Sequence, residues 1–122
     1  MKIDFKALAQ EAVGGSPIMK GREKIAVDTL IALYPNGVTV NGYDFIRKSD
    51  GTGYPVFTIA EDDKVFFNGG AIANKIAEEW TLAAGGDVEA ASRELNEIGG
   101  VKFKIGKRRT NDGRTVNTFD PV

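Results

Sequence analysis

The chain has 122 residues, of which 42% are hydrophobic, and a formal net charge of -1 at pH 7. This length suits one hydrophobic core, so we expect a single domain over residues 1–122, made of an N-terminal helix and connector (1–23) and a core (24–122). Cysteine and histidine are both absent, which excludes disulfides, thiolate chemistry and the usual zinc ligand sets.

The sequence also argues against membrane insertion, catalysis and bound cofactors. No stretch approaches the roughly 20 apolar residues of a membrane-spanning helix, and the N-terminus lacks the apolar run of a signal peptide. The acidic run Glu61–Asp63 suits a tight turn better than a cation site, and residues 14–21 lack the spacing of a phosphate-binding loop. We therefore expect a cytoplasmic protein that is not an enzyme and holds no metal or cofactor.

The first part of the chain predicts two helices followed by a strand. Apolar residues recur at helical spacing from Ile3 until Gly14–Pro17 ends the helix, and Asp28 is placed to cap a second, shorter helix. β-Branched and aromatic residues alternate after the turn Pro35–Gly37, and Asn41–Gly42 marks a bulge. In chain order we expect a helix over Ile3–Val13, a connector over 18–23, a short helix over Thr29–Tyr34 and a strand over Val38–Lys48.

The rest of the chain predicts four more strands around a helical insertion. The turn Asp50–Gly53 joins the first strand to the next, and Asn68–Gly70 ends the third. Gly85–Gly86 separates two amphipathic helices, and Asp87 is placed to cap the second. Period-two alternation then indicates a strand with one face buried. We expect strands over Tyr54–Ile59, Val65–Phe67, Val101–Ile105 and Arg114–Phe119, and helices over Ala71–Ala84 and Val88–Ile98.

This order of elements predicts an α+β fold in the form of a five-stranded antiparallel OB-like barrel, with a helical insertion between strands 3 and 4 and an N-terminal helix. An open antiparallel sheet packed by helices is the structural alternative. Two basic hairpins, Arg47–Gly51 and Arg108–Gly113, fall on the joins between strands 1 and 2 and between strands 4 and 5. Those loops hold oligonucleotides in OB folds, so we expect the two tips to flank a shared trough.

The region from Val38 to Phe119 resembles small phage-type single-stranded DNA-binding proteins. Tyr54–Ile59, Phe66–Gly70 and the terminal hairpin carry the resemblance. It implies non-sequence-specific binding of single-stranded DNA by a phage or prophage protein that is accessory to replication or recombination.

Such binding requires cations that contact phosphates and aromatic rings on which bases stack. Six cations and one carboxylate lie between Val101 and Arg114, so this segment has a net charge of +5. We expect single-stranded nucleic acid as the partner, with DNA favoured, and self-association stays open. The predicted stacking residues are Tyr43, Tyr54 and Phe66, and the predicted phosphate contacts are Arg47, Lys48, Lys102, Lys104, Lys107, Arg108, Arg109 and Arg114.

The alternative function is a phage or prophage protein-interaction module without nucleic-acid binding. In that case the acidic helices dock on a partner protein, and the cations keep the sheet edge soluble. Cations that converge beside exposed aromatic rings favour nucleic acid, whereas cations that splay apart and an apolar patch over the helices favour a protein partner.

Overall fold

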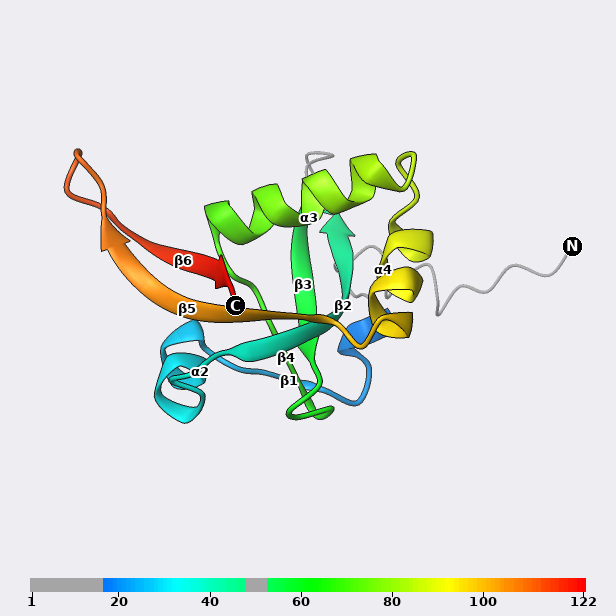
Figure 1. Ribbon diagram of the computed structural model, residues 1–122, viewed down its shortest axis with the longest axis horizontal. Coiled ribbons are helices and arrows are strands. Elements are labelled where there is room, and N and C mark those ends of the chain that lie inside the picture. Colours follow the sequence, from blue (N-terminus) through cyan, green and yellow to red (C-terminus); the bar gives the residue numbers. More distant parts are fainter. Residues whose placement is uncertain (1–16, 48–52) are drawn as a thin grey trace, which may run out of the picture.

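The computed structural model describes residues 17–47 and 53–122, so the expected helix over Ile3–Val13, the residue Lys48 and the turn after it lie outside the described residues. Within them the chain forms an α+β fold with an open six-stranded sheet and three α-helices (Figure 1). The helices are α2 (Val27–Leu33), α3 (Ala71–Ala83) and α4 (Val88–Glu97), preceded by a 3-10 turn, η1 (Pro17–Met19). The strands are β1 (Glu23–Lys24), β2 (Val38–Arg47), β3 (Gly53–Ile59), β4 (Val65–Phe67), β5 (Val101–Arg109) and β6 (Thr115–Pro121).

The sheet has the strand order β1-β4-β3-β2-β5-β6. Neighbouring strands are antiparallel except β1, which runs parallel to β4 and pairs Glu23 with Val65. The predicted closed barrel is therefore wrong, and the open-sheet alternative fits better, with one parallel pair added. Closure of the five-stranded barrel would require β4 to pair with β6, but β1 occupies the outer edge of the short strand β4. The expected connector over 18–23 thus ends in a strand.

Local sequence signals account for most of the element boundaries. Strand β2 has its bulge between Val40 and Gly42, as the Asn-Gly pair predicted, and Asp87 caps α4 by accepting a hydrogen bond from the Ala90 N–H at 3.0 Å. Asp28 does not cap α2. It lies in the first turn of that helix, because the helix begins earlier than the sequence predicted.

The main core lies between one face of the sheet and helices α3 and α4, and α2 adds Val27 and Leu30 to it. A series of buried rings crosses it, with successive centroids 5.2 to 6.3 Å apart. Each such contact adds about 0.5–1.5 kcal/mol beyond simple burial. The series has one ring on each strand from β2 to β6. Strands β4 and β6 have no backbone pairing and meet through their side chains, so the packing curls the sheet without closing it. In order, the rings belong to Tyr43, Phe57, Phe67, Phe119 and Phe103.

A smaller cluster lies on the other face of the sheet. Val56 and Phe66 are buried there, packed with Ile18 and Met19 of η1. Arg22 holds this turn in place, because its Nη1 donates to the Ile18 carbonyl at 2.8 Å and its backbone N–H donates to the Met19 carbonyl at 3.0 Å. The segment that precedes β1 therefore covers the outer face of β3 and β4.

Helix α4 protects the part of the β2 edge that β5 leaves uncovered. Strand β5 pairs with β2 only over Val38–Val40. Beyond the bulge, the Tyr43 N–H donates to Ser92 Oγ at 3.1 Å, and Asn96 Nδ2 donates to the Asn41 carbonyl at 3.3 Å. Side chains of α4 thus take the place of a neighbouring strand, which satisfies backbone groups that an exposed edge would leave to solvent.

Candidate nucleic-acid interface

The β5–β6 hairpin extends beyond the rest of the sheet. Strand β5 pairs with β2 only as far as Phe103, whereas its pairing with β6 continues to Arg109, which lies opposite Thr115. The far half of the hairpin is therefore a two-stranded ribbon, and it projects from one side of the molecule (Figure 1). A long, flexible ligand can therefore contact exposed side chains on more than one side of this ribbon.

Alternation along β5 decides which way its cations point. Phe103 and Ile105 are buried in the core, so Lys102, Lys104 and Arg108 lie on the opposite, outward face, where all three are exposed. Residues two apart on a strand are separated by about 6.8 Å. The three side chains therefore form a row of positive charge along the outward face.

Two of the six cations on the hairpin are held in ion pairs. Lys107 Nζ lies 2.6 Å from Asp28 Oδ1 on α2, and Arg114 Nε lies 3.0 Å from Asp112 Oδ2 in the turn. Both pairs are open to solvent, so each contributes little to stability. Within the described residues, the cations of the hairpin that have no ion-pair partner are Lys102, Lys104, Arg108 and Arg109.

The turn at the tip is ordered by its own hydrogen bonds. The Thr110 N–H donates to the Arg114 carbonyl at 2.7 Å, and the Gly113 N–H donates to the Thr110 carbonyl at 3.0 Å. The Asp112 carboxylate accepts from the Thr110 hydroxyl and from the Arg114 N–H, and these two bonds, the hydroxyl first, lower the pKa of Asp112. Gly113 has a φ of 86°, which favours glycine. The tip therefore has a defined shape.

The stacking rings predicted from the sequence are not available on this surface. Tyr43 and Phe66 are only 1% and 7% exposed, so neither can present a face to a base, and that prediction was wrong. Tyr43 lies in the core, where its hydroxyl is 2.8 Å from Thr81 Oγ1 and where burial raises its pKa, although this hydrogen bond lowers it. Tyr54 is partly buried beside Phe66. Every aromatic side chain that the structure describes is buried or partly buried.

The first basic hairpin is described only in part. Arg47 is the last residue of β2, and its side chain and Lys48 are outside the described part of the chain. Figure 1 places the adjoining ends of β2 and β3 beside α3, well away from the tip of the β5–β6 hairpin. The described strand ends therefore do not bring the two basic hairpins together around one trough.

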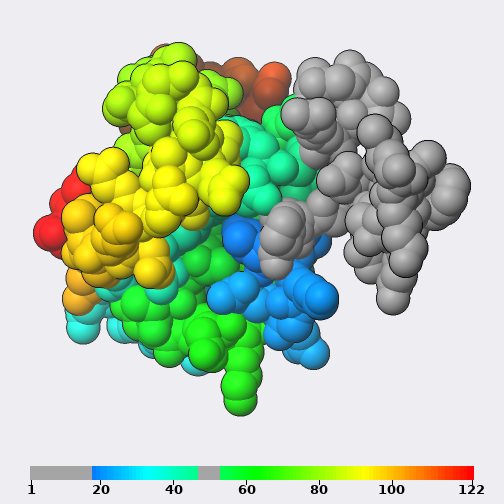
Figure 2. Space-filling view, turned by 90° about the vertical axis from the view of Figure 1, so that its right-hand side faces the viewer, coloured from blue at the N-terminus to red at the C-terminus, as the bar shows by residue number. Residues whose placement is uncertain are grey.

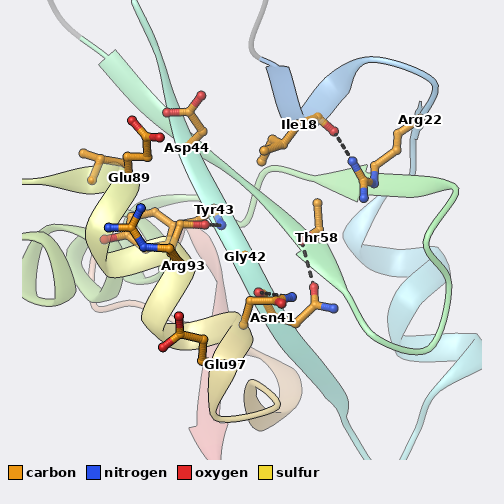
Figure 3. A pocket seen from close by; sticks show the side chains of 13 residues that line it. Ile18, Arg22, Asn41, Gly42, Tyr43, Asp44, Thr58, Glu89, Arg93 and Glu97 are labelled. Carbon is orange, nitrogen blue, oxygen red and sulfur yellow. Dashed lines mark hydrogen bonds between the residues drawn. The ribbon is translucent and has the colours of Figure 1, made fainter.

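A second feature is a groove of about 760 Å³ between α4, β2 and η1 (Figures 2 and 3). Gly42 and Thr58 line it from the sheet, Arg22 lies in the segment after η1, and Arg93 comes from α4. This groove could not be predicted from the sequence, because its residues lie far apart in the chain and form no motif. Its carboxylate lining residues are Asp44, Glu89 and Glu97.

Comparison with protein-family models, with curated proteins and with solved structures finds no match to this chain. Residues 17–47 and 53–122 contain no group of three or more side chains that could hold a metal ion. None of the helices in that part of the chain is long and apolar enough to cross a membrane. The candidate interface therefore rests on the geometry and charge of the β5–β6 hairpin.

Proposed function

We propose that the protein binds single-stranded DNA without sequence preference, through the phosphate backbone, and that the β5–β6 hairpin makes the contact. The observation that carries the proposal is the exposed row of Lys102, Lys104 and Arg108, which runs along β5 from the sheet into the projecting ribbon. Cations in a row neutralise successive phosphates of a flexible strand whatever its bases are. Such binding suits a protein that is accessory to replication or recombination.

The strand order supports a single strand as the ligand. Strands β2 to β6 follow the neighbour order β4-β3-β2-β5-β6, which is the order of an OB fold opened between its third and fifth strands. The opened edges lie close together, because Asn117 Nδ2 on β6 donates to the Gly69 carbonyl after β4 at 3.2 Å. In OB folds the loop between the last two strands contacts oligonucleotides, and here that loop is the basic tip.

Because the aromatic rings are covered, base stacking is not available to strengthen the binding. Base stacking contributes about 1–3 kcal/mol per base where exposed rings are present. Without it, we expect affinity to come from phosphate contacts, so binding is weak at high salt and depends steeply on salt concentration.

Fluorescence anisotropy of labelled oligo(dT), and of a duplex of the same length, tests the proposal at low and high salt. The Lys104→Ala/Arg108→Ala variant is expected to bind oligo(dT) about tenfold more weakly at low salt. The matched control Lys24→Ala/Lys64→Ala removes the same charge near the opposite edge of the sheet, and it is expected to bind like the wild type. Equal losses in both variants, or no binding at low salt, would contradict the proposal, and tighter binding of the duplex would contradict the preference for a single strand.

A protein-binding function is the second candidate, and three observations favour it. The described strand ends of the first basic hairpin lie away from the β5–β6 tip, the described aromatic rings are buried or partly buried, and an apolar groove lies beside α3. The groove measures about 470 Å³, lies between α3 and the β5–β6 strands, and includes Ile72, Ile76 and Trp80 in its lining. Leu82 on α3 and Ile98 at the end of α4 are also exposed, at 70% and 67%. A folded protein that binds neither oligo(dT) nor duplex at low salt would make this the better function.

A further inference from the structure

Charge is divided between two sides of the molecule. The helical segment Ala71–Glu97 has six carboxylates and two cations, a net charge of -4, whereas Val101–Arg114 has a net charge of +5. Figure 2 faces the side with α4 and the groove beside it, and the β5–β6 tip lies behind the molecule in that view. The tip therefore cannot enter the groove of its own molecule.

The backbone of β2 limits what the groove can bind. Two N–H groups that point away from β3 are already used, because Tyr43 donates to Ser92 Oγ at 3.1 Å and Phe45 donates to Asp44 Oδ1 at 2.9 Å. An added strand would find no free donor at these two positions. Recognition in this groove therefore depends on its side chains and not on backbone pairing at these two positions.

Side chains of both signs line the groove. Asp44 on β2 lies opposite residues of α4 that include Glu89 and Arg93 (Figure 3). Glu97 continues the acidic lining near the other end of the helix, and Arg22 adds a cation from the segment after η1. The groove thus has three carboxylates and two arginines, which suits a ligand rich in arginine with a smaller number of acidic groups.

We propose that the β5–β6 tip of one molecule binds in the groove of a second copy. The tip has this composition, with three arginines, Arg108, Arg109 and Arg114, and one carboxylate, Asp112. Arginine and carboxylate groups pair through two parallel hydrogen bonds, which gives direction as well as charge attraction. Tip and groove are different surfaces, so a pair of copies keeps one free tip and one free groove, and the contact repeats into chains or rings. The tip is narrow, so the contact is weak and sensitive to salt.

Sedimentation equilibrium of the full chain without nucleic acid tests this proposal. At low salt the average mass is expected to rise with protein concentration, and at high salt it is expected to return to the mass of one chain. The groove variant Glu89→Gln/Glu97→Gln and the tip variant Arg109→Gln/Arg114→Gln are each expected to associate at least about tenfold more weakly. All four side chains are exposed, so the fold is retained.

A mixture of the two variants gives the sharper result. The groove variant keeps an intact tip and the tip variant keeps an intact groove, so an equal mixture is expected to form pairs of chains and nothing larger. The control Glu78→Gln/Glu79→Gln removes the same charge from exposed positions on α3 outside this groove, and it should associate like the wild type. A wild type that is monomeric at low salt, a mixture that stays monomeric, or an equal loss in the control would overturn the proposal. Since no nucleic acid is present, each of these results is separate from the oligo(dT) measurements.

Discussion

The ion pair between Lys107 and Asp28 provides a test in which the expected result is a gain of binding. The Nζ–Oδ1 distance is 2.6 Å, and the two side chains are 45% and 75% exposed. An exposed pair of this kind contributes at most about 1 kcal/mol to stability, so Asp28→Asn leaves the protein folded. The substitution removes the carboxylate that pairs with Lys107. The Lys107 ammonium group is then available to bind a phosphate of DNA bound along the hairpin.

The size of the gain follows from the number of cations without an ion-pair partner. Each cation that neutralises a phosphate of a single strand contributes about -0.7 to the slope of log affinity against log salt concentration. The four unpaired cations of the hairpin predict a slope of about -2.8 for the wild type and about -3.5 for Asp28→Asn. A tenfold reduction in salt then tightens binding by about 600-fold in the wild type and by about 3,000-fold in the variant.

Anisotropy titrations of labelled oligo(dT) over a series of salt concentrations measure both slopes. The control is Asp63→Asn, which makes the same change of net charge in the exposed turn between β3 and β4. It is expected to keep the wild-type slope. A slope for Asp28→Asn equal to that of the wild type, or the same steepening in both variants, would refute the assignment of Lys107 to the binding surface.

Three further predictions concern the core and the competition between ligands. Phe119→Ala removes ring contacts with Phe67 and Phe103 and should lower the free energy of unfolding, measured in urea, by about 3–5 kcal/mol. A loss below about 1 kcal/mol would show that this ring is not central to the core. Burial raises the pKa of Tyr43 above its ordinary value of 10.0, so the unfolded chain loses the hydroxyl proton at a lower pH than the folded chain does. The free energy of unfolding should therefore fall as pH rises through that value. The same pH dependence in Tyr43→Phe would exclude this cause. If the tip binds both ligands proposed for it, oligo(dT) should reduce the average mass of self-associated protein at low salt, and unchanged association would show that the two ligands use different residues.

Much of the fold could be predicted from local patterns. The bulge after Val40, the cap at Asp87 and the two-residue alternation of Val101–Ile105 each depend on side chains within a few positions of the backbone they control. The charge of the terminal hairpin could be predicted for the same reason, because neighbouring cations on a strand follow its alternation into solvent. The predicted exposure of Tyr43 and Phe66 was wrong, because an aromatic residue on a strand fits a buried face or a wet one equally well until the covering element is known.

The sequence by itself determined the strands and helices from α2 to β6 to within a few residues, and where the largest positive charge lies, since these depend on neighbours along the chain. It did not predict β1. Only the tertiary structure decided that the sheet stays open, because Glu23 and Lys24 of β1 pair with the edge of β4 from a distant part of the chain. Packing likewise decided that α4 replaces a strand beside β2, and that Asp28 meets Lys107 instead of capping a helix. These contacts join residues that are far apart in sequence, and they form only when the hydrophobic faces of the sheet and helices are buried together.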